Sequence, residues 1–326
     1  MIPSEAFQFN LMEHLAPLRP LLDDAKVSEV MINGHETVFY ERGGKLHRSS
    51  QAFASLQDLE SAIAAMAQYM GRHVSAEHPI LEGHLPDGSR VEAVLPPASA
   101  DGPMVAIRRF RKDSMTLATL VELGAMPKSL ARFLTDEVVG KKNILVSGGT
   151  GSGKTTLLNA LAAVAPQDDR IIVLEDAREL QIHMPHVVQL EARPADHRGR
   201  GRVTIRDLFR ATLRMRPDRI VVGEIRGGEA LELVQAMTSG HGGCLSTIHS
   251  SHPRDALARL ETLALMSDVA LPLTALRPQV ASAIDLIVQV SRNGDGTRSI
   301  SEVARVGQYD PERGVDLESV YERCLR

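Results

Sequence analysis

The chain has 326 residues, of which 43% are hydrophobic and 24% are charged, and its formal net charge is −4 at pH 7. This composition is that of a water-soluble globular protein, and the length favours two domains over one. The slight acidity, the 3% of aromatic residues and the lack of tryptophan argue against a dedicated nucleic-acid binder, which carries basic surfaces and aromatic stacking platforms.

The cysteines and the amino-terminus narrow the class of protein further. Cys244 and Cys324 form no CxxC pair, which argues against a zinc site or a disulfide framework and predicts reduced thiols. Met1–Asn10 lacks the basic and apolar regions of a signal peptide, and no segment reaches the ~18 apolar residues that cross a bilayer. A role at a membrane is therefore expected only through partner proteins. Two basic stretches, 108–112 and 198–202, are expected to be solvated faces.

Residues 1–112 predict a small α+β domain. Ser55–Arg72 carries apolar residues at helical spacing, and Ser55 with Asp58 resembles a capping box, so a helix is expected there. A turn at Pro86-Asp87-Gly88 divides Ile80–Pro96 into two strands. Further strands are expected at Val27–Ile32, Thr37–Glu41 and Met104–Phe110.

Residues 113–127 predict a linker that contains a short helix, Leu117–Leu123, ended by Gly124. Residues 128–326 then alternate apolar strands with helices, which predicts a doubly wound α/β core. The strands are expected at Asn143–Val146, Arg170–Leu174, Val187–Glu191, Arg219–Gly223, Cys244–His249 and Ala283–Val290. The helices are expected at Lys154–Val164, Thr204–Met215, Gly228–Ser239 and Pro253–Met266.

The strongest motif is a complete Walker A sequence in the α/β part. It follows a buried strand and precedes an apolar helix, which is the structural context that the motif requires. The glycines let backbone N–H groups surround phosphate oxygens, and the helix N-terminus adds a favourable partial charge. Lys154 is expected to reach the β- and γ-phosphates, and the Thr155 hydroxyl to ligate Mg²⁺. The nucleotide-binding residues are Gly149, Thr150, Gly151, Ser152, Gly153, Lys154, Thr155 and Thr156.

Two further apolar strands end in carboxylates. Glu224 follows Arg219–Gly223 and fits a variant Walker B motif, whereas Glu175 and Asp176 follow Arg170–Leu174. Ligands of open α/β sheets bind beside the carboxyl ends of the strands. Glu224 is therefore expected to orient the attacking water and to help hold the hydration shell of the metal. The Glu175-Asp176 pair has two possible interpretations: it supplies a second acidic group of the site, or it belongs to a surface turn.

Two histidines flank one of the predicted strands. His241 lies in the glycine-rich segment before the strand, and His249 ends it. The strand would carry His249 back to the active end of the sheet, where it could contact the γ-phosphate or relay its presence to a neighbouring subunit. A purely structural histidine is the alternative.

Together, and in this order, these segments resemble the type II/IV secretion ATPase superfamily. Within it they are most similar to the Flp-pilus, or tight-adherence, motor ATPases of the CpaF kind. The usual aspartate before the Leu85–Gly88 turn is Glu82, and the tetracysteine zinc module of general-secretion relatives is absent. The resemblance rests on Ser147–Leu161, Glu175–Ile182, Val203–Leu208, Arg214–Leu231, Ser246–Glu261, Ala281–Arg292, Leu85–Pro97 and Ala106–Phe110.

The resemblance implies a RecA-like P-loop NTPase domain and a homo-hexamer that binds ATP and Mg²⁺ between the amino- and carboxyl-terminal domains. It implies a cytoplasmic location at the inner face of the cell membrane, docked on an inner-membrane platform protein. It also implies catalytic roles for particular side chains. These are Glu175 in the Asp box, Glu224 in the Walker B motif, His241 and His249 in the His box, and phosphate-contacting arginines at Arg90, Arg108 and Arg109.

The expected function is a hexameric, ATP-hydrolysing motor for the assembly of Flp or type IV-like pili or for type II/IV protein secretion. A conjugation-type secretion ATPase is the alternative within the same class. A RecA-like nucleic-acid motor shares the P-loop and the ring, but the composition argues against it, and no nucleic-acid partner is expected. A ring subunit that does not hydrolyse ATP is disfavoured because Lys154, Thr155, Glu175 and Glu224 occur together.

Overall fold

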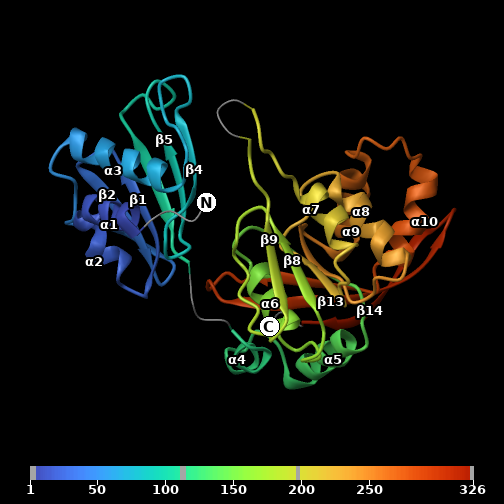
Figure 1. Ribbon diagram of the computed structural model, residues 1–326. Helices are drawn as coiled ribbons and strands as arrows, with labels where there is room; N and C mark the ends of the chain where they lie inside the picture. Colours follow the sequence, from blue (N-terminus) through green and yellow to red (C-terminus); the bar gives the residue numbers. More distant parts are fainter. Residues whose placement is uncertain (1–4, 111–114, 196–198, 324–326) are drawn as a thin grey trace. The chain divides into compact units, whose positions relative to one another are not determined.

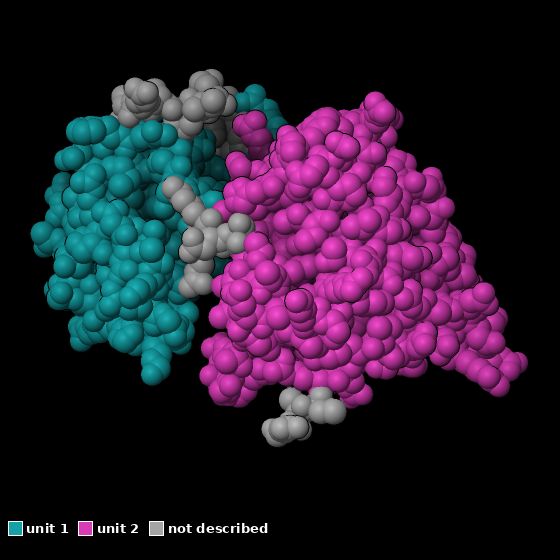
Figure 2. All heavy atoms as spheres, turned by 90° about the horizontal axis from the view of Figure 1, so that it is seen from below, with its two compact units in different colours: residues 1–112, 195–202 teal, residues 113–194, 203–326 magenta. Residues whose placement is uncertain are grey.

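A computed structural model describes residues 5–110, 115–195 and 199–323 (Figure 1). Cys324, the start of the predicted linker and parts of the two basic stretches, namely residues 111–112 and 198, lie outside the described residues. The chain forms two compact units, one of residues 1–112 with 195–202 and one of residues 113–194 with 203–326 (Figure 2).

The first unit is an antiparallel sheet covered by helices. Its six strands lie in the order β3-β2-β1-β6-β5-β4. Buried residues alternate along the strands, as in Val91 and Ala93, and pack against Leu59, Ile63 and Met66 of the longest helix. The elements are α1 (Glu5–His14), η1 (Ala16–Leu18), α2 (Arg19–Leu22), β1 (Val27–Asn33), β2 (Thr37–Arg42), β3 (Lys45–Arg48), α3 (Leu56–Tyr69), β4 (Ile80–His84), β5 (Arg90–Val94) and β6 (Met104–Arg108).

Local sequence explains why α3 begins where it does. The Ser55 side chain accepts a hydrogen bond from the Asp58 amide at 3.2 Å, which satisfies one of the free N–H groups of the first turn. The helix ends before Gly71, whose φ of +63° suits a residue without a Cβ atom. The predicted helix Ser55–Arg72 is therefore present but shorter at its carboxyl end.

The second unit is a doubly wound α/β layer structure. Its eight strands lie in the order β14-β13-β12-β7-β11-β10-β8-β9. The pairs among β12, β7, β11, β10, β8 and β9 are parallel, and β13 and β14 add antiparallel strands at one edge. The strands are β7 (Ile144–Gly148), β8 (Ile171–Glu175), β9 (Val187–Glu191), β10 (Arg219–Val222), β11 (Leu245–His249), β12 (Leu286–Arg292), β13 (Arg298–Asp310) and β14 (Gly314–Glu322).

Successive residues of the central strand enter opposite cores. Ile144 and Val146 pack with the helices on one face, whereas Leu145 packs with those on the other (Figure 1). Burial of both faces explains the nearly continuous apolar strands of this half of the sequence. The first face carries α4 (Leu117–Glu122), α5 (Lys128–Val139) and α6 (Lys154–Ala162), and the second carries α7 (Ile205–Thr212), α8 (Glu229–Thr238), α9 (Pro253–Leu265) and α10 (Leu273–Ala283).

Several of these elements differ from the sequence prediction. Leu117 and Leu120 of α4 are buried in the second unit, so this part of the predicted linker belongs to the packed core. Helix α10 occupies a segment for which no helix was predicted. Pro278 lies inside this helix, although proline disfavours helix interiors. Its residue Ala283, predicted to begin a strand, ends this helix, and β12 begins at Leu286.

Among the described residues, no helix combines the length and the apolar character that crossing a bilayer requires.

Candidate active site

The loop between β7 and α6 has the shape of a phosphate cradle. At Gly148, a Cβ atom would lie 2.4 Å from the Val290 carbonyl oxygen and 2.6 Å from the Ser152 hydroxyl, so only glycine fits. Gly153 has a φ of +100° where it caps α6, which also favours glycine. Among the described residues, no acceptor bonds the amides of Lys154, Thr155 or Thr156 in the first turn of α6. These free donors are suited to phosphate oxygens.

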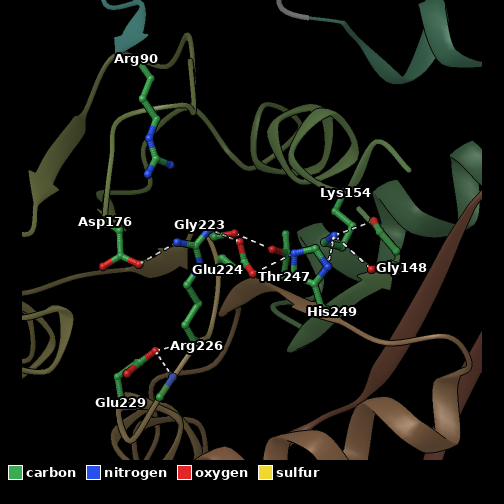
Figure 3. Close-up of polar contacts among 12 residues, drawn as sticks. Arg90, Gly148, Lys154, Asp176, Gly223, Glu224, Arg226, Glu229, Thr247 and His249 are labelled. Atoms are coloured by element: carbon green, nitrogen blue, oxygen red, sulfur yellow. Dashed lines mark hydrogen bonds and ion pairs between the residues drawn. The ribbon is translucent and has the colours of Figure 1, made fainter. Parts of the chain in front are cut away.

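Lys154 is a buried cation with only neutral partners. Its Nζ atom donates hydrogen bonds to the carbonyl oxygens of Gly148 at 3.0 Å and Gly149 at 2.9 Å. Nζ also lies 3.3 Å from Nδ1 of His249, so its three N–H groups are all engaged (Figure 3). Burial lowers the pKa of Lys154 because an ammonium is poorly solvated there. The cradle therefore presents an ammonium that an anionic ligand would stabilise.

His249, at the end of β11, links Lys154 to Glu224. Its Nε2 atom lies 3.0 Å from Oε1 of Glu224. An ammonium can only donate, so Nδ1 of His249 accepts from Lys154 and Nε2 carries the proton that is donated to Glu224. Burial, and after it the nearby charge of Lys154, lowers the pKa of His249. The ring is therefore neutral and fixed in one tautomer.

Glu224 follows β10 and has both carboxylate oxygens engaged. Oε2 accepts a hydrogen bond from Nη2 of Arg226 at 2.8 Å, on the side away from His249 (Figure 3). The strand end is fixed by the Thr247 hydroxyl, which donates to the Gly223 carbonyl oxygen at 2.7 Å. Glu224 and His249 thus lie beside Lys154 at the carboxyl edge of the parallel sheet, as predicted from the ends of their strands.

Glu175 ends β8 and is buried, with 4% of its surface exposed. Its Oε1 atom accepts hydrogen bonds from the amides of Glu179 at 2.9 Å and Leu180 at 2.8 Å. A Cβ atom at Gly223 would lie 3.0 Å from Cγ of Glu175, so the carboxyl group packs directly against the backbone that carries Glu224. Burial raises the pKa of Glu175 to about 7, which is the range of a general base at neutral pH.

The structure does not bring His241 to this edge. His241 precedes β11, and the five residues of that strand separate its two ends by roughly 13 Å. The His241 amide donates to the Ala236 carbonyl oxygen at 3.1 Å, and its own carbonyl accepts from Sγ of Cys244 at 3.1 Å. His241 therefore lies just beyond the end of α8, at the amino edge of the sheet, and β11 runs from this edge to the carboxyl edge that carries His249.

The three candidate arginines belong to the first unit and have different partners there. Arg90 is paired with Glu82 at 2.6 Å, and Arg109 donates to the carbonyl oxygen of Asp24 at 2.8 Å. Arg108 is exposed, and its side chain has no hydrogen bond or ion pair among the described residues. Arg90 and Arg108 are directly opposite each other on β5 and β6, so they share one face of that sheet.

Sequence reasoning missed two residues of the second unit that touch this site. Nε of Arg298, at the start of β13, donates to the Gly151 carbonyl oxygen at 2.8 Å and supports the loop. Arg226 bonds Glu224 and lies 3.7 Å from Asp176. Arg226 stands two positions after Glu224 in a segment already recognised, so its spacing was an available signal, whereas Arg298 lay in a strand that was not predicted.

The site fits a nucleotide better than a metal held by protein ligands alone. Within the described residues, no group of three or more His, Cys, Asp or Glu side chains could hold a metal ion. The free amides of α6 and the buried ammonium of Lys154 instead fit a polyphosphate, whose bound Mg²⁺ needs only one or two protein ligands. Thr155, in the first turn of α6, and Glu224 are the residues that the sequence predicted as these ligands.

Comparisons with known proteins agree with this chemistry. The family described as type II/IV secretion system protein matches residues 12–308. A Mycobacterium tuberculosis protein named for a proposed role in conjugal transfer is 38% identical, and the alignment covers 90% of this chain and 84% of that protein. The type IV secretion system protein PtlH of Bordetella pertussis is 36% identical, covering 87% and 91%. The structure of the Legionella pneumophila ATPase DotB has a TM-score of 0.63 at 20% identity, covering 95% and 84%, and shares the fold.

Proposed function

The chain belongs to the type II/IV secretion system protein family and is an ATPase of that family, and we propose that it is the hexameric motor subunit of a type IV secretion or related pilus machine. The observation that carries this proposal is the continuous set of contacts from the phosphate cradle to the Walker B acid. Lys154, His249 and Glu224 are linked by contacts of 3.3 and 3.0 Å. A change in the contacts of Lys154 with the phosphates would therefore alter the contacts of Glu224, the acid proposed to orient the attacking water.

In this proposal the γ-phosphate of ATP replaces the internal partners of Lys154. The free amides of Lys154, Thr155 and Thr156 would bind phosphate oxygens, and Thr155 and Glu224 would hold Mg²⁺. When bound, the metal would supply positive charge against the charge that develops on the phosphates. Nδ1 of His249, released from Lys154, would donate to the γ-phosphate only after it gains a proton, while Nε2 keeps its contact with Glu224.

Two carboxyl groups are available to act on the attacking water. We propose that Glu224 orients it, since Glu224 is linked through His249 to Lys154 of the cradle. Glu175 is the alternative base because its pKa of about 7 suits proton transfer at neutral pH.

Glu224→Gln and Glu175→Gln distinguish these roles, because each keeps the shape of the side chain and removes the carboxylate. We expect Glu224→Gln to bind an ATP analogue like the wild type and to lose hydrolysis by a factor of about 10² or more. Normal hydrolysis by Glu224→Gln together with an inactive Glu175→Gln would reverse the assignment. Hydrolysis by both variants at the wild-type rate would refute the proposed active site.

The hexamer, the partners and the location are further parts of the proposal. A ring of such subunits would act at the inner face of the cell membrane, docked on inner-membrane platform proteins. Sedimentation analysis with a non-hydrolysable ATP analogue tests the ring. A monomer at tens of micromolar with full ATPase activity would contradict it.

Conjugation or type IV secretion is favoured over Flp-pilus assembly because the names of the relatives above point to conjugal transfer and type IV secretion. The Flp-pilus branch stays the alternative. Deleting the gene and assaying both plasmid transfer and surface pili separates the two. Stimulation of ATP hydrolysis by DNA would instead support a nucleic-acid motor.

A further inference from the structure

Resting on the proposed function, we propose that Arg226 is a positioning residue that holds the Glu224 carboxylate in its working orientation while Lys154 and His249 exchange partners during the ATP cycle. Arg226 ties the loop after β10 to the loop after β8, so that the two acid-bearing segments of the site keep a fixed relation.

The side chain of Arg226 bridges two carboxylates from different strands. Nη2 donates to Oε2 of Glu224 at 2.8 Å, and Nη1 lies 3.7 Å from Oδ2 of Asp176 (Figure 3). Glu224 follows β10, and Asp176 follows β8, its parallel neighbour in the sheet. A planar guanidinium with donors at both ends is suited to such a bridge, whereas a lysine offers a single ammonium.

The backbone of Arg226 is anchored independently of its side chain. Oε1 of Glu229, in the first turn of α8, accepts hydrogen bonds from the amides of Arg226 at 2.7 Å and Gly227 at 2.8 Å. The preceding residue, Ile225, is buried, and its amide donates to the Thr247 carbonyl oxygen at 2.9 Å. The guanidinium therefore projects from a fixed point, which is what a positioning group requires.

The two contacts of Glu224 differ in how they respond to nucleotide. The contact with His249 is one of the two contacts that link Lys154 to Glu224. Phosphate binding at Lys154 would rearrange these contacts. The contact with Arg226 lies on the other carboxylate oxygen and needs no rearrangement when Lys154 turns to a phosphate. Arg226 would thus keep the Glu224 carboxylate in place while the contact between Glu224 and His249 rearranges.

The alternative is an ordinary surface ion pair, since the Arg226 side chain is 53% exposed. Such pairs contribute little to stability, and their removal leaves catalysis untouched. Arg277 provides a matched control in the same unit. Its side chain is 45% exposed, and its Nε lies 3.3 Å from Oε2 of Glu261, away from the residues of the site.

The experiment compares Arg226→Ala, Arg226→Lys and Arg277→Ala in the full chain. We expect Arg226→Ala to lower kcat by about tenfold or more, because a misplaced catalytic group loses rate steeply. The Kd for a non-hydrolysable ATP analogue should change by less than about threefold, since orientation of the acid matters in the transition state and not for binding. Arg226→Lys should recover part of kcat, and Arg277→Ala should match the wild type.

Thermal unfolding supplies the structural readout. Both alanine variants should unfold within about 2 °C of the wild type, as expected for exposed pairs. A kcat for Arg226→Ala within about twofold of the wild type, or a loss of rate explained wholly by weaker nucleotide binding, would overturn the proposal. If wild-type protein hydrolyses ATP and Lys154→Ala does not, these outcomes refute the role of Arg226 alone. Wild-type protein without hydrolysis would refute the proposed function itself.

Discussion

The two edges of the parallel sheet in the second unit use polar groups in opposite ways. At the amino edge, the Arg219 side chain is fully buried, forms an ion pair with Asp169 and donates to the Val138 carbonyl oxygen at 2.7 Å. Asn143 there bonds the carbonyl of Ala283 and the amide of Cys244. At the carboxyl edge, the Lys154 ammonium is bonded to loop carbonyls, and the first amides of α6 have no acceptor among the described residues.

The difference separates structure from activity along a single set of strands. Nε and Nη1 of Arg219 and the side-chain amide of Asn143 are bonded to permanent partners within the protein, so removing one member of such a pair leaves the other buried without compensation. Nη2 of Arg219 and Nδ1 of His241 are buried at this edge with no partner among the described residues. Groups at the carboxyl edge have replaceable partners or none, which is the state that a ligand can improve. Changes at the two edges should therefore affect different measurements.

The largest effect is expected at Lys154, at the carboxyl edge. Lys154→Ala should abolish ATP hydrolysis, by a factor of about 10³ or more, and weaken nucleotide binding, because the phosphate charge loses its partner. The free energy of unfolding should stay equal or rise, since burial already disfavours this ammonium, as its lowered pKa indicates. Steady-state kinetics and urea unfolding measure both quantities. Turnover within about twofold of the wild type would refute the cradle.

A change at the amino edge should produce the reverse pattern. Arg219→Met should lower the free energy of unfolding by about 3–5 kcal/mol, because Asp169 would keep its charge without a buried partner. The ATP turnover of the folded fraction should change little. Arg226→Met, at the carboxyl edge, is the comparison and should lose about 0–1 kcal/mol. Equal losses of stability for the two variants would contradict the proposed difference between the two edges of the sheet.

Glu175 offers a pH-dependent form of the same test. Its pKa is raised from 4.5 to about 7, so the native state holds this proton more tightly than the unfolded state. The resulting stabilisation is fully present below about pH 4.5 and is lost as the pH rises to about 7, a change of about 3 kcal/mol. Urea unfolding of the wild type and of Glu175→Gln across this range should differ by that slope. Parallel curves would show that the pKa of Glu175 is the same in the native and unfolded states.

The smallest expected effect distinguishes the arginines of the first unit. Arg108 has no partner among the described residues, whereas Arg109 is bonded to the carbonyl oxygen of Asp24. We propose that Arg108 acts on the nucleotide, so Arg108→Ala should lower turnover about tenfold with ATP affinity less changed. Arg109→Ala should instead lower the thermal midpoint. Loss of turnover in Arg109→Ala alone would exchange the two roles.

Sequence patterns predicted the parts of the site that depend on local chemistry. The Walker A loop is recognisable from its local spacing, and the structure gives reasons for three of its glycines. A Cβ atom at Gly148 would clash with neighbouring atoms, and Gly151 and Gly153 have positive φ angles. Glu224 and His249 could be placed because the ends of parallel strands meet at one edge of a sheet. The alternating strands and helices follow from the burial of both sheet faces, which leaves nearly continuous apolar strands.

The remaining features depend on contacts between distant segments. Arg298 supports Gly151 across more than a hundred positions of sequence, and no local pattern records that pairing. The strand that carries Arg298 was not predicted, because a register shift at Gln289/Val290 and partly polar faces obscure its alternation. Helix α10 forms despite Pro278 because Leu276 and Val280 are buried in the second core, so packing overrides propensity.

The bonds that Lys154 makes to Gly148, Gly149 and His249 also bear on how a cyclic machine resets. A motor must empty its site after each turnover, and a buried cation left bare would resist the departure of the product. Here the loop carbonyl groups and His249 compete with the nucleotide for the Lys154 ammonium. When the product leaves, these internal partners take its place at the ammonium. The same competition limits how tightly nucleotide can be held, and it favours rapid exchange over long occupancy.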